Sequence, residues 1–171
     1  MSLSSSIVQQ SLEDPIIEKL KLFLNTEKLS RQTIVESTCT FKFDFYNLKE
    51  SILGEIYSCC FPLKEGHKRK IKSDILKLLT YEKLKPNQNF NKYIVLTASQ
   101  ANVKSKDISV LPGEIIRHGS DMNSFIGSKS WLATSIEQFN IQILYFVLDE
   151  EQSDTLNIAR NNQKQGMITK K

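Results

Sequence analysis

An almost continuously apolar segment, Ile52 to Phe61, restricts the fold of this chain more than any other feature. A strand of this composition presents apolar side chains on both faces, so both faces must be covered, as in the sheet of an α/β protein. The lysine-rich segment from His67 to about Lys83 follows, with apolar residues on one helical face: Ile71, Ile75, Leu78 and Leu79. A β-rich run, Lys92 to Ser99, comes next. Strand, helix and strand in this order predict a β-α-β crossover.

The segment before this unit predicts a helix and a first strand. Asp14 and Pro15 have the character of a helix start, and apolar residues follow them at helical spacing. Residues 33–46 alternate as one strand, which we expect to form a hairpin with the Ile52–Phe61 strand. Its apolar side is expected to hold these residues: Val35, Cys39, Phe41, Phe43 and Phe45.

The C-terminal part predicts three more elements. Residues 130–139 have a helical apolar face, residues 140–148 form the plainest strand of the chain, and residues 149–165 begin with acidic side chains as a last helix. Residues 100–127 mix polar and apolar positions and predict no element. The expected fold is α/β, with a mixed central sheet flanked by helices.

Length and composition favour one folded unit. A chain of 171 residues with a hydrophobic fraction of 40% suits a single domain with a real core. We expect a flexible lead over residues 1–12, the domain over residues 13–165, and a loose tail over residues 166–171. Sequences of the types GxSxG, HExxH, GxxxxGK[ST] and GxGxxG are absent, which argues against the hydrolases, zinc proteases and nucleotide-driven enzymes that use them.

Net charge and cysteine content limit the cellular compartment and the kinds of partner that we expect for this chain. The net charge of +4, carried mostly by lysine, suits an affinity for polyanions without establishing it. No apolar run is long enough for a membrane helix, and the N-terminus lacks the layout of a secretory signal, so we expect a cytoplasmic protein with no membrane partner. An odd number of cysteines fits a reducing compartment. A zinc site from Cys59, Cys60 and His67 has no recognised spacing, and buried structural thiols are favoured.

A glutamate interrupts the most apolar strand of the chain. The turn between the two predicted strands can bring Glu55 and Asp44 to one point. Two carboxylates at one half-buried place repel each other and raise their pKa values unless a cation lies between them. Mg²⁺ or Mn²⁺ would meet this need, with the carbonyl of Ile56 as a third oxygen. A lysine of the following helix could then act on a water that attacks a phosphodiester.

These residues resemble a known family. Asp44 in FDF, Glu55 in GEIY and the helix KRKIKSDILKLL are similar to the core of the PD-(D/E)xK, restriction-endonuclease-like superfamily, including small bacterial nuclease-like proteins. The resemblance covers roughly residues 36–165. It implies a restriction-endonuclease-like fold, metal-dependent hydrolysis of DNA rather than RNA, metal binding by Asp44 and Glu55, and pairing into a homodimer.

The lysine of the family motif is replaced here. Two residues after Glu55 the chain has Tyr57, where the family has lysine. Members of the family sometimes supply this lysine from the adjacent helix. Lys70 is the expected substitute, with Asp74 and Lys77 one and two turns further along the same helix face to adjust it.

A non-catalytic interpretation stays open. Glu55 can form a structural salt bridge with Lys70 or Lys77, and Asp44 can cap the turn that follows it. The chain would then be a nucleic-acid-binding or protein-assembly module on a degenerate nuclease fold. Three further basic residues of the helix are either DNA contacts or part of a solvated face: Lys68, Arg69 and Lys72.

Overall fold

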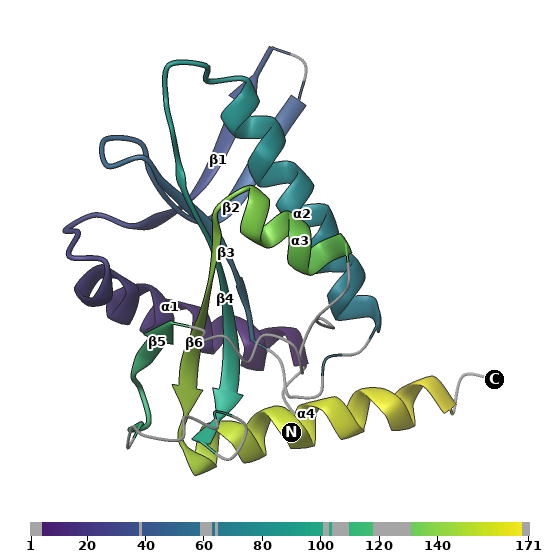
Figure 1. Cartoon of the computed structure of the whole chain (residues 1–171). Helices are drawn as coiled ribbons and strands as arrows, with labels where there is room; N and C mark the ends of the chain where they lie inside the picture. The colour runs from purple at the N-terminus through teal and green to yellow at the C-terminus, as the bar shows by residue number, and fades with distance from the viewer. Residues whose placement is uncertain are drawn as a thin grey trace.

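The fold is α/β, with one mixed sheet of six strands and four helices around it (Figure 1). The computed structural model describes residues 5–37, 39–58, 63, 65–100, 103, 110–117 and 131–168. The elements, in chain order, are α1 (Ser5–Phe23), β1 (Ser30–Glu36), β2 (Cys39–Asn47), β3 (Ile52–Tyr57), α2 (Glu65–Lys83), β4 (Asn91–Ser99), β5 (Ile115–Arg117), α3 (Trp131–Gln138), β6 (Ile141–Leu148) and α4 (Glu150–Ile168).

The sheet combines an antiparallel and a parallel part. Its strand order is β1-β2-β3-β4-β6-β5. Strands β1, β2 and β3 run antiparallel in succession, whereas β3, β4 and β6 are parallel, and β5 pairs antiparallel with β6. The predicted crossover is therefore confirmed, with α2 between the parallel strands β3 and β4. All six residues of β3 are buried, as a strand covered on both faces requires.

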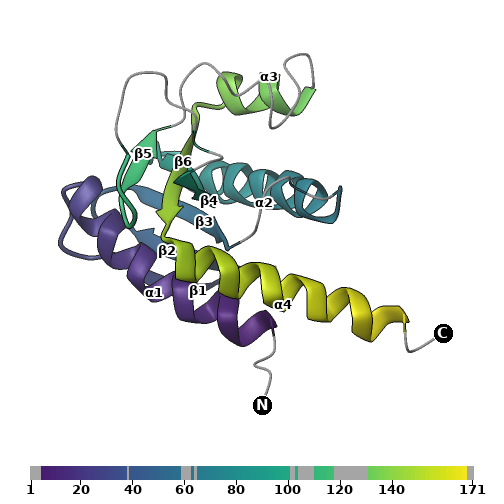
Figure 2. The same ribbon diagram turned by 90° about the horizontal axis from the view of Figure 1, so that it is seen from below.

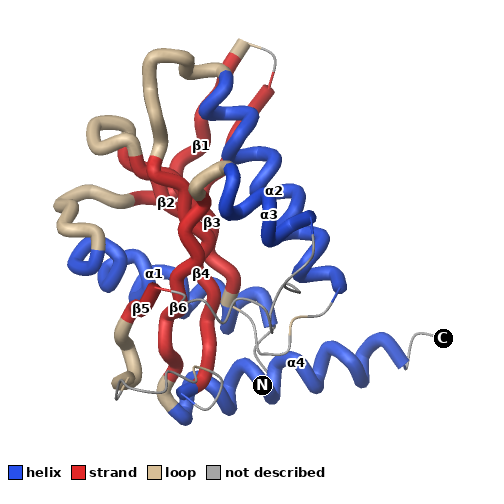
Figure 3. The backbone as a smooth tube through the Cα atoms, in the orientation of Figure 1, coloured by secondary structure: helices blue, strands red, loops and turns tan. Residues whose placement is uncertain are grey.

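Helices cover both faces of the sheet and divide the core in two. Figure 2 shows α2 and α3 on one side of the strands and α1 and α4 on the other. Leu78 of α2 and Ile136 of α3 belong to the cluster on the first side. Ile16 of α1 and Leu156 of α4 belong to the cluster on the second side. Where β2 pairs with β1 but no longer with β3, these two strands bend away from the rest of the sheet and run beside α2 (Figure 3).

The helix at the N-terminus begins earlier than predicted. It starts at Ser5, so the expected helix start at Asp14 is wrong, and residues 5–12 belong to α1 rather than to a flexible lead. Pro15 lies inside the helix, where it lacks the N–H of the usual helical hydrogen bond. Leu12 is buried in the cluster on that side, which explains why the helix continues past the proline. At the other end of the chain, α4 continues through Gly166 to Ile168.

The predicted strand over residues 33–46 is two strands. Glu36 of β1 pairs with Cys39 of β2, so the chain reverses within two residues. Residues that face each other across a hairpin point to the same side of the sheet, and Ile34 pairs with Phe41. Ile34 therefore packs against the core, whereas Val35 is 77% exposed instead of sharing the apolar side with Phe41. The two residues between Glu36 and Cys39 include neither glycine nor proline, so the alternation of apolar and polar residues continues across the turn in the sequence.

Candidate functional site

A bulge in β2 sets the position of Asp44. Gln32 pairs with Phe43 and Ser30 with Tyr46, so β2 has one residue more than β1 over this interval. Phe43 accordingly packs on the α2 side of the sheet and Phe45 on the α1 side, although strict alternation predicts one side for both. The prediction for Phe45 is wrong for this reason. Bulges redirect a side chain, and here the residue between the two phenylalanines is Asp44.

A glycine in β3 makes the bulge possible. Gly54 pairs with Phe45, and a Cβ on this residue would lie 2.3 Å from Cζ of the Phe45 ring and 2.6 Å from the carbonyl oxygen of Tyr93. The pairing of β2 with β3 ends at this pair. Beyond it, the backbone N–H of Ile56 donates a hydrogen bond of 2.9 Å to Oδ2 of Asp44. The two strands thus part at Asp44, and its carboxylate lies between them. We call this place the fork.

The fork holds a buried glutamate and the ammonium of a lysine. Glu55 is only 4% exposed. Its Oε1 lies 2.8 Å from Nζ of Lys77, and the same Nζ lies 3.0 Å from Oδ1 of Asp74. Lys77 also donates a hydrogen bond of 2.9 Å to the carbonyl oxygen of Lys42 on β2. One ammonium from α2 therefore contacts both strands of the fork.

The tyrosine in the motif's lysine position is also held by α2. The hydroxyl of Tyr57 donates a hydrogen bond to Oδ2 of Asp74. Nζ of Lys70 lies 5.0 Å from the centre of the Tyr57 ring, a cation–π contact at the edge of the site. Burial, followed by the hydrogen bond to Asp74, raises the pKa of Tyr57 well above its ordinary value. Tyr57 is thus a neutral hydrogen-bond donor that orients Asp74.

Burial and neighbouring carboxylates together set the electrostatics of the fork. Burial, and next the neighbouring Asp44, raise the pKa of Glu55 to about 8, although Lys77 opposes the shift. Burial by itself lowers the pKa of Lys77, but the carboxylates of Glu55 and Asp74 outweigh it and hold the pKa above its ordinary value. Lys77 is therefore charged at neutral pH, and its single charge is shared between two carboxyl groups.

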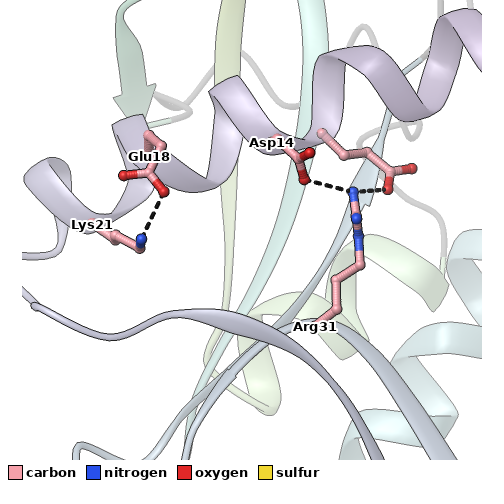
Figure 4. Close-up of polar contacts among 5 residues, drawn as sticks. Asp14, Glu18, Lys21 and Arg31 are labelled. Atoms are coloured by element: carbon pink, nitrogen blue, oxygen red, sulfur yellow. Dashed lines mark hydrogen bonds and ion pairs between the residues drawn. The ribbon is translucent and has the colours of Figure 1, made fainter.

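A further carboxyl group, Glu13 of α1, lies on the opposite face of the sheet and interacts electrostatically with Asp44. Oε2 of Glu13 lies 2.8 Å from Nη2 of Arg31, which also lies 3.1 Å from Oδ1 of Asp14; Figure 4 shows Arg31 reaching from β1 to the helix. Burial raises the pKa of Glu13, and the charge of Asp44 raises it further. Glu13 was not predicted as a site residue, because the helix was expected to start at Asp14. Leu12, one helical turn before Ile16, was the signal that the helix began earlier.

The structure brings most of the predicted site residues together. Asp44, Glu55, Asp74 and Lys77 meet at the fork. Lys70 is exposed and lies over Tyr57, whereas the lysine beside Glu55 is Lys77. In an extended strand the N–H and C=O of one residue point to the same side, so the carbonyl of Ile56 faces the β2 side of β3, as its N–H does.

The structure bears on the metal sites expected from the sequence only in part. Among the described residues, no group of three or more His, Cys, Asp or Glu side chains is arranged to hold a metal ion. The weaker zinc candidate cannot be placed, because Cys59 and Cys60 lie outside the described residues. A metal at the fork would therefore rest on two carboxylates and backbone oxygen.

Comparisons with protein-family models, with curated proteins and with solved structures found no match. Within the described ranges, none of the helices combines the length and apolar character needed to cross a membrane. The interpretation of the site therefore depends on its own geometry.

Proposed function

We propose that this chain is a metal-dependent nuclease of the PD-(D/E)xK type, which hydrolyses phosphodiester bonds of DNA at the fork. The observation that carries the proposal is the convergence of Asp44 from β2, Glu55 from β3 and Lys77 from α2 at the place where the hairpin opens. The family motif has acidic residues on a hairpin with a lysine close by. Here the lysine comes from α2, because Tyr57 takes its usual position.

The donor set fits a hard divalent cation. Mg²⁺ takes oxygen ligands, often only one or two carboxylates together with water, so Asp44, Glu55 and the carbonyl of Ile56 form a sufficient set. Three carboxyl groups at the fork, Asp44, Glu55 and Asp74, face the single ammonium of Lys77. Oε1 of Glu55 is buried and, among the described residues, makes no hydrogen bond of good geometry even though Lys77 is near. A cation would relieve this imbalance of charge.

The residues of the chain have separate roles in this proposal. Asp44 and Glu55 would hold Mg²⁺ or Mn²⁺, which would supply the Lewis acidity that stabilises charge on a phosphate. Asp44 is fixed by the N–H of Ile56, and Glu55 by its burial in β3, so both carboxylates are held before a ligand arrives. Lys77 is positioned by Asp74 to orient the attacking water and to neutralise charge that develops on the phosphate. Lys70 adds positive charge at the outer edge.

Cleavage of plasmid DNA in the presence of Mg²⁺ or Mn²⁺ tests the proposal. Glu55→Gln and Lys77→Met are expected to slow cleavage by about 100-fold or more, because each removes a group that acts at the reacting phosphate. Lys85→Met is the matched control: Lys85 also pairs with a glutamate on a strand, Glu36 at 2.7 Å, but away from the fork. This control should cleave at the parental rate. Undiminished cleavage by Glu55→Gln or by Lys77→Met would contradict the proposal.

A second function is favoured by a specific contact. The ion pair of Glu55 and Lys77 is close and its acid is buried, which suits a structural bridge between α2 and the sheet. On this basis the chain would be a non-catalytic nucleic-acid-binding or assembly module. No cleavage with either metal, together with no effect of Mg²⁺ on the melting temperature, would favour this function over the nuclease.

A further inference from the structure

An exposed tryptophan lies beside a lysine at the edge of the helical layer. Trp131 is the first residue of α3, the only tryptophan of the chain, and 63% exposed. Nζ of Lys72 on α2 lies 5.0 Å from the centre of its ring. Leu132 and Ile136 bury the apolar face of α3, so the indole of Trp131 is not needed for the packing of this helix and is accessible to a ligand.

Basic side chains connect this tryptophan to the fork. Successive residues of a helix are rotated by about 100°, so the outer surface of α2 presents Lys72 on the flank toward α3, then Arg69, and then Lys70 on the flank toward the sheet. Lys77 continues this band to Glu55. Arg69 and Lys70 are exposed, and Lys72 is partly exposed. The acidic side chain at the start of α2, Glu65, pairs with Lys68 at 2.9 Å.

We propose that Trp131 and Lys72 form a stacking site for an unpaired base, and that the sugar–phosphate backbone of the same strand crosses α2 along Arg69 and Lys70 to the fork. The inference rests on the proposed function and names its substrate class as single-stranded nucleic acid or a single-stranded end. The band is positively charged, which favours a polyanion over an apolar protein partner.

The chemistry of the surface explains why the base must be unpaired. Stacking needs an accessible aromatic face on the protein and a free face on the base, and a base inside a duplex has neither face free. Lys72 covers part of the indole and can at the same time contact the phosphate next to the stacked base. The rest of the indole remains open, as its exposure shows. Exposed aromatic side chains next to a positively charged path for the backbone are a recurring combination in single-strand binding.

The only tryptophan of the chain provides a direct test, because its fluorescence reports this site alone. The full chain, in EDTA so that no cleavage occurs, is titrated with labelled single-stranded dT15, single-stranded rU15 and a 15-base-pair duplex. Anisotropy of the label gives the affinity and tryptophan emission reports the stacking. We expect both single strands to bind and to quench Trp131 with the same midpoint as the anisotropy, and the duplex to quench little.

Variants sharpen the test. Trp131→Ala is expected to weaken single-strand binding about tenfold, and Lys72→Ala to lower the slope of log affinity against log salt by about 0.7. Phe139→Ala is the matched control, since Phe139 is an exposed aromatic (48%) just after α3, and its affinity should stay within about twofold of the parent. If Trp131→Ala does not fold, the quenching of tryptophan emission in the parent chain still shows whether a base stacks on Trp131.

The outcomes separate this inference from the nuclease proposal. Single-strand binding without quenching, equal affinity of Trp131→Ala and the parent, or no single-strand binding at all would each overturn the stacking site. Quenching by single strands, without any cleavage of plasmid DNA or of single-stranded DNA in Mg²⁺, would support the stacking site and contradict the nuclease. Cleavage of plasmid DNA without quenching of Trp131 would support the nuclease and contradict the stacking site.

Discussion

Within the part of the chain that the structure describes, two ion pairs join α2 to the sheet, and the buried partner has the opposite charge in each. In one, the buried partner is a lysine of a strand: Nζ of Lys92 on β4 lies 2.6 Å from Oε1 of Glu82 on α2. In the other, the buried partner is an acid of a strand, Glu55, and the lysine, Lys77, comes from the helix. Both pairs link the same two layers, so their differences are informative.

In the pair of Glu82 and Lys92 the two charges balance and both partners make further hydrogen bonds, and we call such a pair closed. Nζ of Lys92 also donates to the carbonyl oxygen of Phe90 at 3.0 Å, and Oε1 of Glu82 accepts the N–H of Phe90 at 3.0 Å. One positive and one negative charge meet there and each has further hydrogen bonds. This arrangement is what a structural ion pair needs to offset the cost of burial.

The pair at Glu55 is not closed in this sense. Lys77 is shared with Asp74 and with the carbonyl of Lys42, and Asp44 adds a further negative charge. A structural bridge gains nothing from surplus carboxylates, whereas a cation site requires them. The comparison therefore favours a structural role for Glu82 with Lys92 and a functional role for Glu55 with Lys77.

Removal of one partner should cost most at the closed pair. Glu82→Ala leaves the buried ammonium of Lys92 with only the carbonyl of Phe90, and we expect a loss of about 3 kcal/mol in the free energy of unfolding. Lys77→Met should cost about 1 kcal/mol or less near pH 6, because Glu55 with its raised pKa already holds a proton at this pH and is not left as an unpaired buried charge. Urea unfolding of both variants measures the difference. Equal losses would contradict the distinction between the two pairs.

The backbone beside Glu55 gives the next largest effect. Gly54→Ala would place a methyl group 2.3 Å from the ring of Phe45 and 2.6 Å from the carbonyl oxygen of Tyr93, so the bulge must shift. We expect a loss of about 2 kcal/mol in the free energy of unfolding and reduced cleavage. Gly66→Ala in α2 is the control, because no atom lies within 4 Å of its added Cβ. It should be neutral or slightly stabilising, and an equal loss in both variants would show that the bulge is not responsible.

Much of the fold follows from the sequence because its signals are local. The apolar runs of β3, β4 and β6 and the periodicity of α2 each appear within about ten consecutive residues, so the crossover and the two-sided cover were predictable. The turn between β1 and β2 was not, since Ser37 and Thr38 carry no strong turn signal. The boundary of α1 was misread because a proline inside a helix usually marks its first turn.

The candidate site likewise combines features that the sequence predicts with features that it does not. Glu55 stands out in the sequence as an acid in an apolar strand, and Asp44 as its partner on the hairpin. The next helix offered Lys70 and Lys77, and the lysine expected at the carboxylates was Lys70, whereas Lys77 lies beside Glu55. The bulge that directs Asp44 into the fork depends on contacts between β1, β2 and β3, and on the fit of the Phe45 ring over Gly54. Such a fit joins residues that are far apart in the chain, so no local pattern announces it. Glu13 was missed for a related reason, since only the packing of α1 against the sheet brings it near Asp44.

The pH dependence of stability tests the unequal charge at Glu55 directly. The folded chain holds the pKa of Glu55 at about 8, above the ordinary value of 4.5, so the folded state keeps a proton that the unfolded state releases. The contribution of this carboxyl group is therefore fully present below about pH 4.5 and is lost as the pH rises through 8. In EDTA, the stability of the parent relative to Glu55→Gln should fall between pH 5 and pH 8.5, by up to a few kcal/mol. Urea unfolding of the two chains across this range measures the difference. A difference that stayed constant with pH would mean that Glu55 is ionised throughout, in a closed pair with Lys77 like that of Glu82 with Lys92, and the argument for a cation at the fork would lose its electrostatic basis.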